Sequence, residues 1–398
     1  VQHARHFKTP RHFPAGPRGP TIRGMNIHVD IRRDAARAAG VSLAGLESVA
    51  EVFVQQLETD LHPGAKLTVR RGGEIVLDAH GGRMSSAPDA APVDDYTLFL
   101  IFSATKPLTA FAIHLLAERG QLDLEVPVAR VWPEFGQRGK EAATIVHVLS
   151  HQGGFPIGPR WLTWDLWRDR ASVARAMEER TARWEPGTDV GYHPLNYGWA
   201  LGEIVRRVDG RSLGRFLADE LFGPLGMRDT WLGLPPEMDS RVAHHADLSG
   251  EFPFVADFNR PEVHAAEAGA ATGITTTRDL TLFYSMLLAG GEWEGRRYLR
   301  RETLERAVRP VVDGARDRTL EVPVRWALGF HLGGPTSAFG RRSSPLAFGH
   351  SGHGSTTGWA DPTRGIAVAY FTNGVRGSID NYLRMTRLCD PILAACDD

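Results

Sequence analysis

The sequence predicts an α+β protein: an antiparallel sheet, flanked by helices from the N-terminal and C-terminal parts of the chain, with an inserted, mainly helical lobe. Three observations lead to this prediction. Short strand patterns separated by turn residues occur near residues 65–80 and again after residue 322. Helical spacing of apolar residues dominates the region between them. The first and last long periodic segments, 43–61 and 379–395, are helical. Both ends of the chain therefore contribute to one layered unit.

The elements of the first third are marked by spacing and by turn residues. Residues 43–61 carry apolar side chains at helical spacing and stop at a Pro-Gly pair. Strands at 65–71 and 74–80 enclose an Arg-Gly-Gly turn, which predicts a hairpin. The apolar run 97–102 predicts a buried strand, and a helix is expected to start near its end, at about residue 103.

The middle of the chain is mainly helical in pattern, and the last quarter returns to strands. Helices are predicted at 142–150, 171–180, 195–208, 213–221, about 277–288 and 298–307. Residues 232–265 show few regular signals. Strands are predicted at 322–332, 347–350, 356–360 and 366–372.

These patterns predict an irregular N-terminal tail at residues 1–24 and a single domain at 25–398. Within the domain, residues 25–109 and 265–398 are expected to form the α/β lobe. Residues 110–264 are expected to form the helical lobe. A cleft is expected at the seam between the two lobes, where ligand sites form.

The bulk properties exclude several classes of function. The formal net charge is −1, so nothing favours nucleic acid or an anionic membrane as a partner. No apolar run reaches the roughly 18 to 20 residues that cross a bilayer, and the first residues lack the apolar core of a secretory signal, which predicts a cytoplasmic protein. Cys389 and Cys396 form neither a disulfide framework nor a metal-site pattern. The 16 histidines show no ligand spacing, so neither a metal nor a cofactor is expected.

The most informative stretch is a Ser-x-x-Lys pattern at the start of the seam helix. Ser103 and Lys106 are three residues apart, so they share one helix face. The chain has only four lysines, and its other basic residues are arginine. A lysine at this position therefore indicates a need for an amine that can lose its proton, which arginine cannot do. The bare pattern also occurs by chance at ordinary helix starts.

Two later stretches offer the other groups that a serine nucleophile needs. Such a nucleophile requires a base, a proton carrier for the leaving group and donors for the oxyanion. Tyr192 follows a Pro-Gly turn and can carry a proton, although a tyrosine packed at a helix start is the alternative. His350 lies in a glycine-rich strand whose N–H groups could reach a substrate carbonyl. For His350 taken alone, a structural histidine is the simpler interpretation.

Three tryptophans recur at every third residue between Pro- and Gly-containing segments. These are Trp161, Trp164 and Trp167. They predict either an aromatic stripe in the core of a helix or an apolar wall over a cleft.

The order and spacing of these residues resemble the serine β-lactamase and penicillin-binding-protein superfamily. Ser103-Ala104-Thr105-Lys106 resembles its Ser-x-x-Lys motif. Tyr192-His193-Pro194 falls where the family has Tyr-x-Asn, and His350-Ser351-Gly352 falls where it has Lys-Thr-Gly. The resemblance covers about residues 43–395. It is nearest to the class C-like branch, which includes family VIII carboxylesterases and related transacylases.

The resemblance implies a β-lactamase/transpeptidase-like fold and a role for each matched residue. Ser103 would be acylated, Lys106 would be its base, and Tyr192 would carry a proton to the leaving group. His350 would replace the lysine of the third motif. The oxyanion would be held by the backbone N–H groups of Ser103 and His353. The substrate contacts would be Trp161, Trp164, Trp167, His193, Ser351 and Gly352.

Two departures from the family pattern narrow the expected activity. Pro194 lacks the side-chain amide of the family's asparagine, and His350 can be neutral near pH 7, unlike a lysine. The positive charge that would meet a β-lactam or peptide carboxylate is thereby weakened. We expect a serine hydrolase that acts on an ester, thioester or lactone through an acyl-Ser103 intermediate.

Three alternatives to this activity remain. They are an acyltransferase that passes the acyl group to an alcohol or amine, a β-lactamase or D,D-peptidase, and a non-catalytic binding protein. The expected partners are a small acyl substrate and an acyl acceptor. The sequence carries no signal for the oligomeric state.

Overall fold

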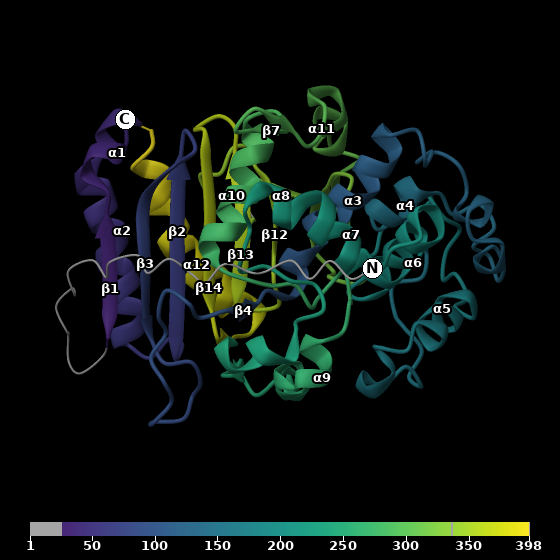
Figure 1. Ribbon diagram of the computed structural model, residues 1–398, viewed down its shortest axis with the longest axis horizontal. Coiled ribbons are helices and arrows are strands. Elements are labelled where there is room, and N and C mark those ends of the chain that lie inside the picture. Colours follow the sequence, from purple (N-terminus) through teal and green to yellow (C-terminus); the bar gives the residue numbers. More distant parts are fainter. Residues whose placement is uncertain (1–25, 336, 398) are drawn as a thin grey trace, which may run out of the picture.

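A nine-stranded antiparallel sheet forms the centre of the structure, a computed structural model that describes residues 26–335 and 337–397 (Figure 1). The strand order is β1-β3-β2-β14-β13-β12-β11-β10-β9. The N-terminal strands are β1 (Ile27–Ile31), β2 (Gly64–Arg71) and β3 (Glu74–Gly82). The later strands are β9 (Val312–Arg316), β10 (Pro323–Trp326), β11 (His331–Leu332), β12 (Phe348–Ser351), β13 (Thr356–Asp361) and β14 (Ile366–Thr372). The prediction of one sheet built from both parts of the chain is confirmed.

The two parts of the chain meet where β2 pairs with β14, in a register that aligns Leu67 with Tyr370 and Thr68 with Ala369. Successive side chains of a strand point to opposite faces of the sheet. Leu67 and Tyr370 accordingly join the core under the N- and C-terminal helices. Thr68 faces the opposite layer, where its hydroxyl donates to Asp78 Oδ1 at 2.6 Å and lies 2.8 Å from the Thr277 hydroxyl.

Helices cover both faces of the sheet. On one face α2 (Leu43–Glu58) packs against α12 (Ser378–Ala394), and α10 (Thr277–Leu288) covers the other (Figure 1). The buried side chains of α2 recur at helical spacing, and Ser42 caps its N-terminus by accepting from the Gly45 N–H. Each such buried apolar side chain contributes roughly 1.5–3 kcal/mol to the free energy of unfolding. The predicted flanking helices are therefore present.

The helical lobe lies beyond the β12 side of the sheet (Figure 1). Its helices are α3 (Lys106–Glu118), α4 (Ile145–Leu149), α5 (Arg170–Glu178), α6 (Asn196–Asp209), α7 (Leu213–Leu217), α8 (Gly223–Leu225) and α9 (Pro261–His264). Residues 106–116 of α3 are all buried. The remaining elements are α1 (Arg33–Ala38), α11 (Arg301–Ala307), β4 (Phe99–Leu100), β5 (Ala246–Asp247), β6 (Ile274–Thr275), β7 (Glu292–Trp293), β8 (Arg296–Arg297) and β15 (Gly374–Val375). The division into lobes at residues 110 and 264 stays a prediction.

Several elements differ from the sequence prediction. The run 97–102 forms only the two-residue strand β4, which pairs with β6 outside the main sheet. A 3₁₀ turn, Phe102–Thr105, follows it, and α3 begins at Lys106. The extended conformation ends at Ile101, whose ψ is +9°, and Phe102 follows with a φ of +47°, so the chain turns before the strand can continue. The predicted strand 322–332 is split into β10 and β11, which form a hairpin.

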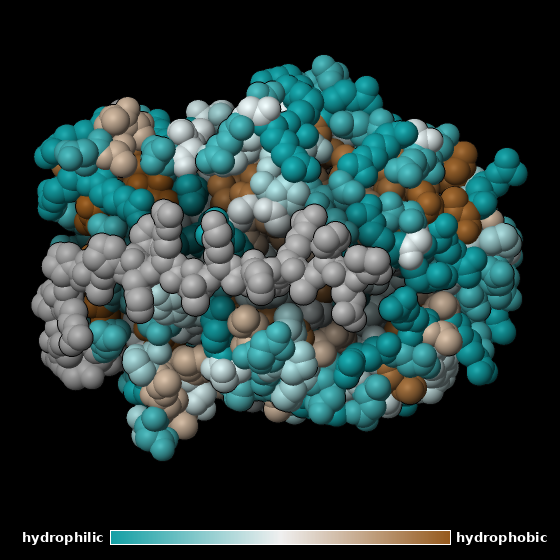
Figure 2. Space-filling view, viewed as in Figure 1, coloured by the Kyte–Doolittle hydropathy of each residue, from teal (hydrophilic) through white to brown (hydrophobic). Residues whose placement is uncertain are grey.

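On the face shown in Figure 2, hydrophilic side chains cover most of the surface, and apolar ones show mainly in the gaps between them. Among the described residues, no helix is both long enough and apolar enough to cross a membrane. Cys389 and Cys396 are buried free thiols. The predicted tail, 1–24, lies outside the described residues.

Candidate active site

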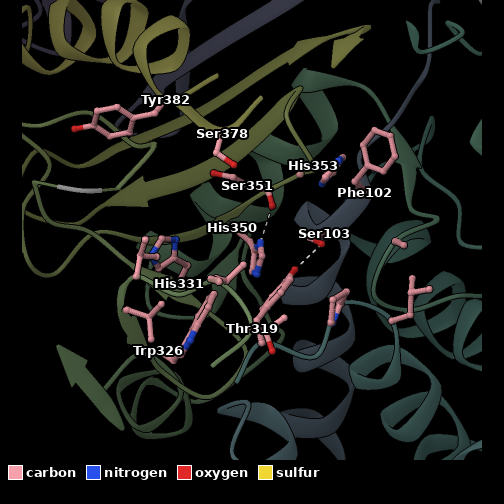
Figure 3. A pocket seen from close by; sticks show the side chains of 18 of the residues that line it. Phe102, Ser103, Thr319, Trp326, His331, His350, Ser351, His353, Ser378 and Tyr382 are labelled. Carbon is pink, nitrogen blue, oxygen red and sulfur yellow. Dashed lines mark hydrogen bonds between the residues drawn. The ribbon is translucent and has the colours of Figure 1, made fainter. Parts of the chain in front are cut away.

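Ser103 lies in the turn between β4 and α3 and faces a cavity (Figure 3). The residue before it, Phe102, adopts the left-handed backbone conformation, which is uncommon for a bulky side chain. Its ring packs against His245 and Phe258, with centroids 4.6 and 4.9 Å away. Surrounding contacts of this kind are what maintain a strained backbone at a functional position.

Lys106 is fully buried, and its Nζ atom contacts three oxygens. Ser103 Oγ lies at 3.0 Å, the Pro194 carbonyl at 2.9 Å and the Ala270 carbonyl at 3.1 Å. Burial lowers the pKa of Lys106 well below its usual value. Carbonyl oxygens only accept, so they take both N–H bonds of the neutral amine. The lone pair of the amine then faces Ser103 Oγ, which is the orientation of a base.

The Tyr192 hydroxyl donates a hydrogen bond to Ser103 Oγ at 2.6 Å. Burial raises the pKa of Tyr192 above its usual value, so the phenol keeps its proton at neutral pH. Its ring stacks on Trp326 with the centroids 5.6 Å apart, and its backbone N–H donates to Asp317 Oδ1 at 2.9 Å. Ser103 Oγ therefore lies between an amine that can take a proton and a phenol that can give one.

His350 lies on the same cavity as Ser103, at the end of β12 (Figure 3). Its Nδ1 donates to the Ser351 carbonyl at 2.7 Å, because a carbonyl can only accept. Burial lowers the pKa of His350 well below its usual value. The imidazole is therefore neutral near pH 7, with its proton on Nδ1, and it places no positive charge in the cavity.

The loop after β12 lies against the turn that carries Ser103. The Thr356 hydroxyl donates to the Ile101 carbonyl at 2.9 Å. A Cβ atom on Gly352 would lie 2.3 Å from the same carbonyl, so only glycine allows this approach. His353, which follows Gly352, lines the same cavity as Ser103. The N–H groups of Ser103 and His353 are the candidate oxyanion donors.

The cavity has a volume of about 1120 Å³, and its lining is mainly apolar. Its large apolar side chains are Phe102, Trp164, Leu195, Phe254, Phe258, Leu320, Val322, Val324 and Trp326. Its polar side chains include those of Ser103, Tyr192, Thr319, His331, His350, Ser351, His353, Ser378 and Tyr382. Among the described residues that line it, none is Lys, Arg, Asp or Glu.

The structure separates the predicted substrate contacts into two groups. Trp164, Ser351 and Gly352 line the cavity. Trp167 is buried behind Trp164, with ring centroids 4.4 Å apart. Trp161 is 40% exposed and does not line the cavity. The tryptophan stretch forms neither a regular helix nor a continuous wall. Its only helical part is the short 3₁₀ turn Trp164–Leu166, and the residues on either side of this turn are irregular.

His193 also lies outside the cavity lining. It is buried, its Nε2 accepts the Phe155 N–H at 3.1 Å, and its Nδ1 contacts the Gly191 carbonyl at 2.6 Å. Both ring nitrogens are engaged with the backbone, so the side chain holds the Tyr192 loop instead of facing a ligand.

Sequence reasoning did not identify Phe254, Phe258, Asp317 or Trp326 at this site. Asp317-Arg318-Thr319 has the composition of a turn, and that was the available signal for Asp317. Nothing local distinguishes the aromatic residues from core residues. No group of three or more His, Cys, Asp or Glu is placed to hold a metal ion within residues 26–335 and 337–397.

Comparison with known proteins identifies the family. The chain matches the Beta-lactamase family over residues 49–388. It belongs to the β-lactamase family. The esterase/β-lactamase LipL of Mycobacterium tuberculosis (strain ATCC 25618 / H37Rv) is 32% identical over 374 residues, which cover 85% of this chain and 83% of LipL. The resemblance inferred from the motifs is thereby confirmed.

Solved structures agree with this assignment. A penicillin-binding protein homologue from Caulobacter crescentus superposes with a TM-score of 0.79 at 33% identity, covering 89% of this chain and 99% of that one. A family VIII carboxylesterase superposes with a TM-score of 0.78 at 29% identity, with the same coverage of both chains. This β-lactamase-family chain is therefore a hydrolase of the β-lactamase/transpeptidase-like fold, and its relatives include esterases.

Proposed function

We propose that this protein hydrolyses neutral carboxylic esters through an acyl-Ser103 intermediate, with Lys106 as base and Tyr192 as proton carrier. The observation that carries the proposal is a Ser103 hydroxyl held between Lys106 Nζ and the Tyr192 hydroxyl. It faces an apolar cavity whose lining, as far as the structure describes the chain, includes no Lys, Arg, Asp or Glu. The names of LipL, an esterase/β-lactamase, and of the family VIII carboxylesterase neighbour support an ester as substrate.

In the first step, Ser103 Oγ attacks the ester carbonyl carbon while Lys106 Nζ takes the hydroxyl proton. The carbonyl oxygen becomes an oxyanion held by the N–H groups of Ser103 and His353. Loss of one such donor typically costs about 10²–10³ in kcat. The carbon–oxygen bond to the alcohol then breaks, and Tyr192 gives its proton to the departing oxygen.

The position of Tyr192 suits this proton transfer. In the tetrahedral intermediate, the leaving oxygen is bonded to the same carbon as Ser103 Oγ. A phenol that lies 2.6 Å from Oγ is therefore also within reach of the leaving oxygen. The proton on Lys106 restores the phenol. Water then attacks the acyl carbon by the reverse route and releases the acid.

The charge of the lining favours esters over β-lactams and D,D-peptides. Those substrates carry a carboxylate, which requires a positive partner when it leaves water. His350 is neutral near pH 7. Burial favours the neutral amine of Lys106, and Ser103 and two carbonyls occupy its Nζ atom. Transfer of the acyl group to an alcohol uses the same intermediate, and the apolar lining would hold an apolar alcohol better than water.

The proposal is tested with p-nitrophenyl butyrate, a chromogenic cephalosporin and a phosphonate ester that labels active serines. We expect hydrolysis of the butyrate with a kcat/KM at least about 100-fold above that for the cephalosporin. We also expect a mass increase on Ser103 and loss of both results in Ser103→Ala. Full turnover by Ser103→Ala, or preference for the cephalosporin, would contradict the proposal. Added alcohol acceptors would reveal transfer as a new ester product.

A further inference from the structure

The loop between β9 and β10 is joined to Tyr192 by a single carboxylate oxygen. Asp317 begins this loop and is fully buried. Its Oδ1 atom accepts three backbone N–H groups, from Tyr192 at 2.9 Å, Thr319 at 2.8 Å and Leu320 at 2.9 Å. Asp317 and Tyr192 are 125 positions apart in the chain. The carboxylate therefore connects two segments that the sequence does not link.

The bond to Tyr192 distinguishes Asp317 from an ordinary turn residue. An aspartate that only stabilises a turn bonds to N–H groups two or three positions further along, as Asp317 does with Thr319 and Leu320. The third hydrogen bond, from the Tyr192 N–H, comes from a segment outside the loop. A backbone bond from the Arg318 N–H to the Val190 carbonyl, at 2.9 Å, reinforces the same connection.

The β9–β10 hairpin fixes both the backbone and the ring of Tyr192. Asp317 holds the backbone N–H, and Trp326 of β10 stacks on the ring with 11° between the planes. Val190, Tyr192, Val312, Val324 and Trp326 form a small separate apolar cluster. The tyrosine is thus positioned by the edge of the sheet, while Ser103 is positioned by the turn before α3.

We propose that Asp317 is a positioning residue for Tyr192: its Oδ1 keeps the phenol at the place where it can protonate the leaving oxygen. The inference rests on the proposed ester hydrolysis, in which Tyr192 has that role. Displacing a reacting group by about 1 Å can lower the rate about 10²-fold. Loss of the Asp317 anchor should therefore slow the transfer of the proton from Tyr192 to the leaving oxygen.

The test uses two esters of one acid that differ in their need for a proton. p-Nitrophenolate is a stable anion and leaves without protonation, whereas ethoxide must be protonated as it leaves. The kcat/KM ratio of p-nitrophenyl butyrate to ethyl butyrate therefore reports proton delivery. A lower folded fraction, or general loosening of the cavity, reduces both values by one factor and leaves the ratio unchanged.

We expect Asp317→Ala to lower kcat/KM about 100-fold for ethyl butyrate and less than about 5-fold for p-nitrophenyl butyrate. The ratio then shifts by about 20-fold or more, in the same direction as in Tyr192→Phe. Asp317→Asn keeps an oxygen that accepts the same N–H groups, so its ratio stays within about 3-fold of the unaltered protein. If circular dichroism shows that Asp317→Ala does not fold, Asp317→Ser replaces it with the same expectation.

Asp169→Ala is the matched control, because the Asp169 carboxylate also accepts two backbone N–H groups, at the start of α5 and outside the cavity. Its ratio should not change. The inference is overturned if Asp317→Ala lowers both esters equally, or if Asp317→Asn shifts the ratio as far as Asp317→Ala.

The two proposals fail in different ways. If Ser103→Ala keeps full turnover of both esters, the proposed function itself is wrong. If Ser103→Ala is inactive and Tyr192→Phe shifts the ratio while Asp317→Ala does not, only the role of Asp317 is wrong.

Discussion

At the scale of single residues, the proposed chemistry depends on the protonation of one buried amine. The hydrogen bonds of Lys106 Nζ are all taken by Ser103 Oγ and two backbone carbonyls, at 2.9–3.1 Å. Its environment favours the neutral amine through burial. An arginine in the same place would be permanently charged and could not accept a proton.

Lys106→Arg should therefore lower the rate of Ser103 acylation by about 10²–10⁴, the usual contribution of a base. The release of p-nitrophenolate in a single turnover measures this step. Lys140→Arg is the control: Lys140 is also buried and donates to backbone carbonyls, including Gln137 at 2.9 Å, but lies outside the cavity. Its rate per folded molecule should not change. Acylation of Lys106→Arg at the original rate would exclude Lys106 as the base.

The pH dependence of the reaction follows from the lowered pKa of Lys106. The base acts when deprotonated, so kcat/KM for a neutral ester should rise with pH through the Lys106 pKa and then level off. Because burial lowers that pKa, this rise should lie well below the usual lysine value of 10.5. His350 is neutral throughout the neutral range and should add no step near 6.5. A rate profile from about pH 5 to 10 measures this. A rise centred near 10.5 would contradict the buried neutral amine.

Local residue patterns could be predicted from the sequence, and contacts between distant segments could not. The three-residue spacing of Ser103 and Lys106 is a property of one helix start. The proton position on His350 depends on the orientation of the Ser351 carbonyl. The anchoring of Tyr192 by Asp317 depends on packing across 125 positions, which no short motif records.

At the scale of elements, the last helix supports the loop that carries a candidate oxyanion donor. Arg384 of α12 is buried and donates to the Gly374 carbonyl at 2.9 Å and to the Gly354 carbonyl at 2.6 Å. Gly354 directly follows His353 in the loop after β12. A helix on the far side of the sheet from α10 therefore reaches the edge of the cavity.

Arg384→Met should lower kcat per folded molecule by about tenfold, less than the 10²–10³ cost of losing an oxyanion donor outright. It should also lower the free energy of unfolding by about 1–3 kcal/mol, because two carbonyls lose their donors. Arg387→Met, an exposed position on the same helix, is the control. Steady-state kinetics and urea unfolding measure the two effects. An unchanged kcat with reduced stability would restrict Arg384 to a structural role.

Long elements were predicted well, and short ones at the sheet edges were not. α2 and α12 carry apolar residues at helical spacing over several turns, and such a long pattern indicates a helix and not a strand or a loop. β9 has five residues, four of them exposed, and its Val-Asp-Gly-Ala-Arg sequence resembles a loop. β1 also has five residues, but its Ile-His-Val-Asp-Ile alternation is a strand pattern that sequence reasoning did not identify. The run 97–102 predicts a longer strand than β4, because its apolar residues do not reveal the turn that begins at Ile101.

At the scale of the molecule, the cavity is assembled from segments of both predicted lobes. Trp164 from the predicted helical lobe and Val322 and Val324 from the predicted α/β lobe all line it. The fold class could be predicted because strand patterns appear at both ends of the chain. The size of the cavity and the uncharged character of its described lining could not be predicted, since the lining comes from many separate segments.

Trp164→Ala should raise KM for an ester with a long acyl chain by about tenfold and leave KM for an acetate ester within about 2-fold. The reason is that the long chain loses an apolar contact, whereas the acetyl group does not reach the wall. Trp161→Ala is the matched control, because Trp161 lies outside the cavity, next to Arg175. Equal changes in KM for both esters would show that Trp164 does not contact the acyl chain.

The pairing of β2 with β14 has a consequence for biosynthesis. Arg71 pairs with Ile366, so the ribosome must add about 295 residues between the two partners. At a synthesis rate of about 5–20 residues per second, roughly 15–60 s pass between the synthesis of β2 and that of its partner β14. During that interval an apolar strand edge is unpaired, and such edges promote association between chains. We therefore expect the nascent chain to need chaperones more than the finished protein does. We also expect expression at a lower growth temperature to improve the recovery of folded protein.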